Sequence, residues 1–135
     1  MSVGTDSMCF CCGKDNPVGL KMSFSRDGDL FFSEVTPPDF LQGYSGILHG
    51  GITSTLLDEV MANHLLAMGM RAVTADLFVR FKKPVPMGVP LKIISRQVSG
   101  RKSLFEMESW LEGPGGEVMA TATAKMMVVK GGSTR

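Results

Sequence analysis

A histidine followed by two glycines, His49-Gly50-Gly51, stands where a loop gives way to a long apolar segment. Glycine allows close approach of a ligand to the backbone, and the first amides of a helix have no acceptor within it. These amides lie at the positive end of the helix dipole, where they can bind an anion or a developing oxyanion. Two interpretations are open: an oxyanion site, or a tight turn that only starts the helix.

Two adjacent acids, Asp58 and Glu59, interrupt the apolar segment. Asp58 is nine residues after His49, a rise of about 13 Å along a helix, whereas catalytic groups need to come within about 3 Å of their target. The two residues therefore cannot act on one carbonyl within one chain. Either both acids lie at a solvated margin of the helix, or two chains pair so that Asp58 of one faces the helix start of the other. The second alternative predicts an active site shared across a homodimer.

The composition is that of an ordinary globular protein, and we expect one domain over residues 1–135, with a cysteine-containing N-terminal segment over residues 1–20. A formal net charge of +1 provides no extended positive field and argues against a nucleic-acid partner. The apolar runs are too short for a membrane span, and the N-terminus lacks the pattern of a signal peptide. We therefore expect a cytoplasmic protein with reduced cysteines.

The elements that must position these residues are two strands, one long helix and four further strands. Asp27-Gly28 is a turn dipeptide between the first two strands, and the Pro- and Gly-containing loop of residues 36–51 is long enough to be functional. The helix should run from near Gly50 to about Met68, with Gly69 ending it. It is apolar on more than one side, which predicts that protein surrounds it.

Four strand patterns follow the helix, at residues 73–81, 89–98, 101–112 and 117–129. In the first, the odd positions are apolar and Thr74 shares the polar positions with Asp76. The links are short and rich in Gly or Pro, which predicts that consecutive strands are antiparallel neighbours. The expected architecture is α+β: a curved antiparallel sheet of about six strands wrapped around one central helix, its other face covered by a second copy or by solvent.

The sequence resembles the hotdog-fold acyl-CoA thioesterases, in the branch with an HGG-x6-Asp signature that includes the phenylacetate-pathway thioesterases. The signature here is HGGITSTLLD, residues 49–58. The segment CFCCGKDNPVGL, residues 9–20, resembles the CF-x-CG-x-x-NP-x-GL segment of one subgroup, and RFKKPVPMG, residues 80–88, resembles the F-x-x-P-x-x-x-G turn of the family. The resemblance implies the hotdog fold over nearly the whole chain.

The same resemblance implies hydrolysis of an acyl-CoA by a homodimer or a dimer of dimers, without a cofactor or metal. Asp58 corresponds to the family's general base or nucleophile, and the Gly50 amide to its oxyanion donor. His49 would orient the thioester, and Thr74 would hold the attacking water.

Several residues are weaker candidates for the same site. Some members of the family have an asparagine six residues before the histidine, whereas this chain has Gly43 there and Gln42 beside it as a substitute. Glu59 competes with Asp58, because hotdog enzymes of another branch use a glutamate on this helix. Contacts with substrate or with the coenzyme A phosphates are expected among Gly51, Glu59, Arg80, Lys82, Lys83, Arg101 and Lys102.

Two other functions and one metal site remain as alternatives. A non-catalytic acyl-CoA-binding or regulatory domain would keep the pocket without the base, and a hydratase or dehydratase would pair an acid with a histidine in one site. Cys9 and Cys12 form a C-x-x-C pair with Cys11 between them, but structural zinc sites usually need a second pair. The sequence therefore favours a packed turn over a metal site there.

Overall fold

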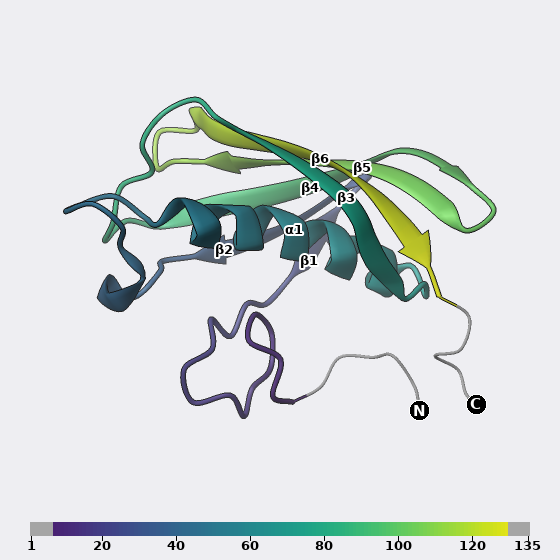
Figure 1. Ribbon diagram of the computed structural model, residues 1–135, viewed down its shortest axis with the longest axis horizontal. Coiled ribbons are helices and arrows are strands. Elements are labelled where there is room, and N and C mark those ends of the chain that lie inside the picture. The colour runs from purple at the N-terminus through teal and green to yellow at the C-terminus, as the bar shows by residue number, and fades with distance from the viewer. Residues whose placement is uncertain (1–6, 130–135) are drawn as a thin grey trace.

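In the computed structural model, which describes residues 7–129, six antiparallel strands curve around helix α1, Gly50–Ala67 (Figure 1). The strands are β1 Ser25–Asp27, β2 Leu30–Val35, β3 Ala72–Phe81, β4 Leu91–Arg101, β5 Leu104–Glu112 and β6 Val118–Val128. A short 3-10 helix, η1 Asp39–Leu41, lies in the loop before α1. The predicted order of elements and the α+β architecture are confirmed. Gly69 ends the helix with a φ of 87°, as expected of a glycine stop.

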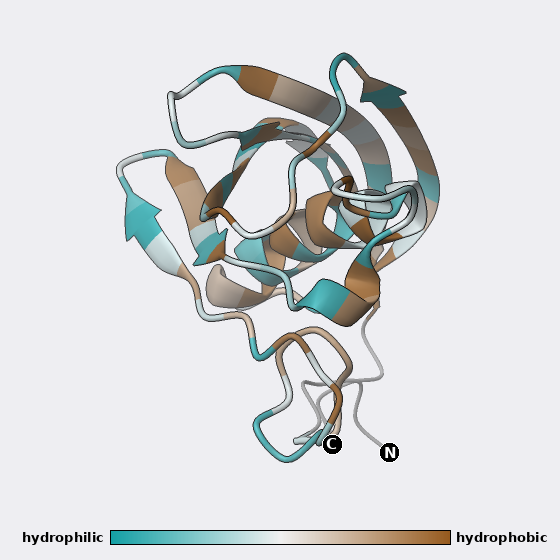
Figure 2. Cartoon of the chain, turned by 90° about the vertical axis from the view of Figure 1, so that its left-hand side faces the viewer, coloured by the Kyte–Doolittle hydropathy of each residue, from teal (hydrophilic) through white to brown (hydrophobic). Residues whose placement is uncertain are grey.

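Helix α1 lies in the hollow of the curved sheet, which arches over it in Figure 2. Its fully buried apolar residues are Leu56, Leu57, Val60, Met61 and Leu65. The buried residues of strand β6 include three alanines, Ala120, Ala122 and Ala124, whose small side chains allow close packing. The prediction that protein surrounds the helix is confirmed.

Within residues 7–129, no helix is long and apolar enough to cross a membrane.

The prediction that consecutive strands are neighbours is wrong for β3 and β4. The sheet order is β1-β2-β4-β5-β6-β3, so β3 pairs with β6 at one edge. The links of residues 102–103 and 113–117 are tight enough to make hairpins, but the link of residues 82–90 is not. Leu48 N–H donates to Val85 O at 2.8 Å, and Ile47 bridges to Pro86. The link is thus tied to the loop before α1 and crosses the end of the sheet.

The free edge of β3 has no partner strand within the part of the chain that the structure describes. Large apolar side chains of this strand are exposed: Val73, Leu77, Phe78 and Phe81, the last with 54% of its surface accessible. An unpaired edge with exposed apolar residues is prone to pair with another strand.

A β-bulge at Ala75 changes which side chains of β3 face the helix. Thr74 pairs with Met126 but Asp76 pairs with Lys125, so Ala75 is an extra residue in the register. Asp76 Oδ1 accepts the Lys125 backbone N–H at 2.9 Å, which satisfies an amide at the bulge. The prediction that Thr74 and Asp76 share a face is wrong, because the extra residue shifts the alternation and places Thr74 opposite the buried Met126.

His64 is a core residue, as a histidine within an apolar helix usually is. Its Nδ1 lies 2.9 Å from Ser95 Oγ, its ring stacks on Phe31 at 5.1 Å between centroids, and only 4% of its surface is exposed. Burial, together with the charge of Arg26, lowers the pKa of His64 below its ordinary value. The neutral imidazole is therefore the form that the fold stabilises.

We expect the free energy of unfolding to decrease as the pH falls below about 6.5, because the unfolded chain then binds a proton that folded His64 resists. The slope for one proton is at most about 1.4 kcal/mol per pH unit. Denaturant unfolding of the wild type and His64→Gln between pH 5.5 and 7.5 tests this, with His49 unchanged in both proteins. Identical pH slopes for the two proteins would contradict the assignment.

Candidate active site

The first turn of α1 leaves one backbone amide available for a ligand. His49 is the N-cap, and its Nδ1 accepts the Gly51 N–H at 2.9 Å. The amides of Ile52 and Thr53 both donate to His49 O at 3.0 Å. Within residues 7–129, no acceptor is found for the Gly50 N–H. An amide of this kind at a helix N-terminus can donate to a carbonyl or an oxyanion.

Gly51 makes room for the histidine cap. A Cβ at this position would lie 3.1 Å from Nδ1 and Cε1 of the His49 ring, so a side chain would push against the imidazole. Because Nδ1 accepts a hydrogen bond, a neutral His49 carries its proton on Nε2. The His-Gly-Gly sequence thus holds the imidazole in place and leaves the Gly50 amide free. The Gly51 N–H is not free, because it donates to His49 Nδ1.

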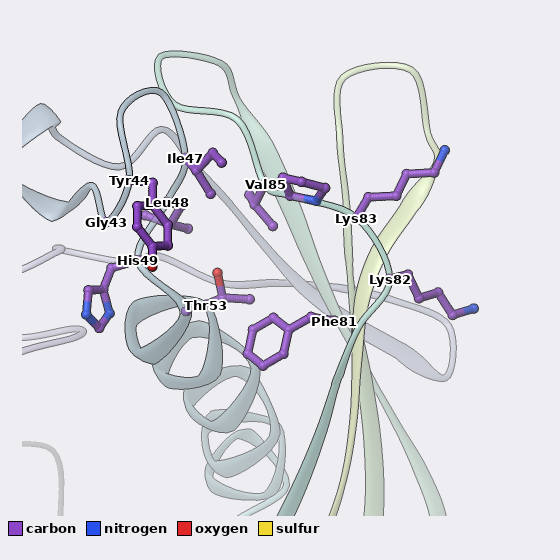
Figure 3. Close-up of a pocket in the computed structure, with 12 residues that line it drawn as sticks. Gly43, Tyr44, Ile47, Leu48, His49, Thr53, Phe81, Lys82, Lys83 and Val85 are labelled. Carbon is purple, nitrogen blue, oxygen red and sulfur yellow. The ribbon is translucent and has the colours of Figure 1, made fainter.

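A cavity of about 670 Å³ opens beside this turn. The loop before α1, the first turn of the helix and the segment after β3 line it (Figure 3). Thr53 belongs to the first turn of α1, Phe81 lies beside that turn, and Tyr44 comes from the loop. The sequence reasoning missed these three residues, because only the tertiary structure brings the loop and the end of β3 to the helix start. The volume is sufficient for a small-molecule ligand.

Asp58 lies away from this cavity and pairs with Thr74. Thr74 Oγ1 donates to Asp58 Oδ1 at 2.6 Å, and the half-buried carboxylate lies at the side of the helix next to β3. Neither residue lines the cavity at the helix start. The structure therefore brings Asp58 and Thr74 together and keeps both apart from His49 and Gly50.

Glu59 faces a different neighbour from Asp58. Its Oε2 accepts from Asn63 Nδ2 at 2.6 Å, and its carboxylate lies beside Cys9 and Cys12 of the N-terminal segment. Adjacent helical residues differ by about 100° in direction, which separates the two acids. The expectation that Glu59 contacts substrate stays a prediction, and its observed contacts are with the protein.

Gln42 and Gly43 belong to the turn that leads to the helix. Gln42 Oε1 accepts from Gly46 N at 3.0 Å, so its amide oxygen is engaged within the loop. A Cβ at Gly43 would lie 3.2 Å from His49 Cα, closer than an ordinary contact. An asparagine at position 43 would therefore require the loop to shift. A direct role for Gln42 in the site stays a prediction.

The basic residues expected to contact phosphates are not brought together. Lys82 and Lys83 line the cavity, and Lys83 Nζ forms an ion pair with Glu117 Oε2 at 2.6 Å. The Arg80 guanidinium lies 5.7 Å from the centre of the Phe78 ring. Arg101 is the last residue of β4 and Lys102 follows it. This 11-residue strand begins after the cavity-lining segment, so both cations lie at its other end. Among the predicted cations, Lys82 and Lys83 are the two that line the cavity at the helix start.

Comparison with known proteins identifies the family. A model described as the thioesterase superfamily matches residues 45–126. The acyl-coenzyme A thioesterase THEM4 of Bos taurus is 37% identical over 65 residues, which are 47% of this chain and 26% of the relative. The match thus covers about a quarter of that relative's length.

Two solved structures share the fold over most of the chain. The first, protein RHA08564 of the thioesterase superfamily, has a TM-score of 0.81 at 22% identity, covering 90% of this chain and 62% of that chain. The second is the BH2602 protein from Bacillus halodurans with CoA. It has a TM-score of 0.73 at 26% identity and covers 86% of this chain and 77% of that chain.

Proposed function

The chain belongs to the thioesterase superfamily, and from this premise we propose that it hydrolyses an acyl-CoA thioester to a free acid and coenzyme A. The observation that carries the proposal is the Gly50 amide, which has no acceptor among residues 7–129 and lies at a cavity large enough for an acyl-thioester. The BH2602 protein, which has the same fold, has a structure with CoA. Lys82 at the cavity, which takes part in none of the ion pairs formed by residues 7–129, supplies positive charge for the phosphates of coenzyme A.

In the proposed reaction, Gly50 N–H donates to the thioester oxygen as it becomes an oxyanion. Asp58 acts as general base on a water molecule, or as a nucleophile toward the carbonyl carbon, and Thr74 orients the carboxylate through its bond to Oδ1. Attack forms a carbon–oxygen bond, the carbon–sulfur bond then breaks, and the coenzyme A thiolate takes up the proton that the attacking water gave to Asp58. In the nucleophilic route, water afterwards hydrolyses the anhydride between the acyl group and Asp58, and the thiolate is protonated from solvent. The net reaction consumes one water molecule.

The two halves of this site come from two chains in our proposal. Asp58 and Gly50 are eight residues apart on one helix, about 12 Å at the helical rise. Twofold pairing along the exposed β3 edge would run the two copies of α1 in opposite directions, so that Asp58 of one copy approaches the helix start of the other. The exposed Leu77, Phe78 and Phe81 would be covered in the same contact.

Thiol release from a panel of acyl-CoA substrates of different chain length and aromaticity tests the activity. We expect release of free coenzyme A well above the uncatalysed rate for at least one member of the panel. Binding of acyl-CoA without thiol release from any member would instead indicate a non-catalytic binding domain.

A heterodimer of two inactive variants tests the shared site. One subunit carries Asp58→Asn and the other Gly50→Pro, with different tags so that the mixed dimer can be purified. One of its two sites then combines both lesions, and the other is intact, so we expect about half of the wild-type activity. If both groups acted within one chain, each site would carry one lesion and the mixed dimer would be as inactive as its parents.

A further inference from the structure

The N-terminal segment, residues 7–24, forms a loop on the side of α1 away from the sheet (Figures 1 and 2). Gly13 N–H donates to Cys9 O at 2.8 Å, which turns the chain back on itself. A Cβ at Gly13 would lie 2.4 Å from both Cys9 N and Ser7 O, so only glycine fits the turn. The turn brings the side chains of Cys9 and Cys12, the two cysteines of the C-x-x-C pair, close together.

Glu59 of α1 completes a cluster with these cysteines. One sulfur each from Cys9 and Cys12 and one carboxylate oxygen of Glu59 lie within 4.8 Å of one another, and all three residues are half-buried. Tetrahedral zinc holds its ligand atoms roughly 3 to 4 Å apart, at about 2.3 Å from sulfur and about 2.0–2.2 Å from oxygen. Small side-chain rotations would therefore close the cluster around one ion.

The charge and the hydrogen bonds at Glu59 also favour a cation. Among the ion pairs formed by residues 7–129, none includes Glu59, so this half-buried carboxylate has no Lys or Arg partner. Asn63 Nδ2 donates to Glu59 Oε2 at 2.6 Å and orients the carboxylate. A hydrogen bond of this kind to a ligand is a common support of metal sites.

We propose that Cys9, Cys12 and Glu59 bind a zinc ion that fastens the N-terminal segment to α1. Two thiolates and a carboxylate suit zinc, and water takes the fourth position. Binding forms two zinc–sulfur bonds and one zinc–oxygen bond and releases the two thiol protons to solvent. The sequence alone showed only the C-x-x-C pair, because the third ligand lies far along the chain. The site is separate from the proposed thioesterase chemistry, although Glu59 adjoins Asp58.

The test uses the full chain, stripped of metal with a chelator, kept under a thiol-free reductant and titrated with Zn²⁺ or Co²⁺. We expect about one zinc per chain by elemental analysis and a thiolate-to-cobalt charge-transfer absorption on adding Co²⁺. Cys9→Ala and Cys12→Ala should lose both, and Glu59→Gln should weaken zinc binding at least about tenfold. Zinc should also raise the Tm of the wild type but not that of Cys9→Ala.

Cys11→Ala is the matched control, because it removes the neighbouring thiol without removing a proposed ligand. It should keep one zinc per chain and the cobalt absorption. The proposal is overturned if the wild type shows no thiolate-to-cobalt absorption, or if Cys9→Ala retains the zinc of the wild type. Equal loss of zinc in Cys11→Ala and Cys9→Ala would likewise overturn the ligand set.

Discussion

Replacing Asp58 with asparagine is expected to lower kcat for acyl-CoA hydrolysis by a factor on the order of 10²–10⁴, the usual contribution of a positioned acid–base group. Asparagine has nearly the same shape and can still accept the Thr74 hydrogen bond made at 2.6 Å. Its amide cannot take a proton from water or attack the thioester. The loss should therefore appear in the rate of thiol release at saturating substrate, with little change in the melting temperature.

Glu59→Gln is the matched control for this prediction, since it makes the same change of charge one residue further along α1. The observed contacts of Glu59 are with Asn63 and the N-terminal cysteines. Glu59→Gln should therefore keep most of the thioesterase activity. The opposite pattern, with Glu59→Gln inactive and Asp58→Asn active, would move the catalytic role to Glu59.

Gly50→Pro is expected to lower kcat about 10²–10³-fold, the range found when one oxyanion donor is removed. Proline has no backbone N–H but is well accommodated at the first position of a helix, where Gly50 stands. The preceding residue, His49, has φ −56° and ψ 132°, an extended conformation that proline allows. The substitution therefore removes the proposed donor with little disturbance to the helix.

Gly50→Ala is the control, because alanine keeps the amide. Its Cβ would lie 3.6 Å from the Phe81 ring, an ordinary contact. We expect Gly50→Ala to retain most of the activity, measured by thiol release alongside a circular dichroism check that both variants fold. If Gly50→Pro were as active as Gly50→Ala, the Gly50 amide would not be the oxyanion donor.

The elements of this fold could be predicted because each has a strong local pattern. The strands alternate, α1 is apolar on several sides, and Gly69 stops it as predicted. The neighbours of β3 could not be predicted, because the link of residues 82–90 is neither a tight hairpin nor a helical crossover. Its path depends on a long-range hydrogen bond between Leu48 and Val85.

The candidate site, like the fold, could be predicted from the sequence only in part. His49 and Asp58 are nine residues apart on one helix, a rise of about 13 Å. This distance already shows that the two cannot act on one carbonyl within one chain. Thr74 was predicted by resemblance, but its approach to Asp58 depends on the bulge at Ala75, which a period of two cannot reveal. The cavity at the helix start likewise needs a loop and a strand end that are more than thirty residues apart, from Tyr44 to Phe81.

The sequence by itself determined the elements, the curved sheet around one helix and the distance between the two ends of the proposed site. These follow from periodicity, turn residues and helical rise, which are local properties. The tertiary structure decided that Asp58 faces Thr74 while Glu59 faces Cys9 and Cys12. The directions of two adjacent acids on a largely buried helix depend on what packs against each side, and here one set of partners precedes the helix in the chain and the other follows it.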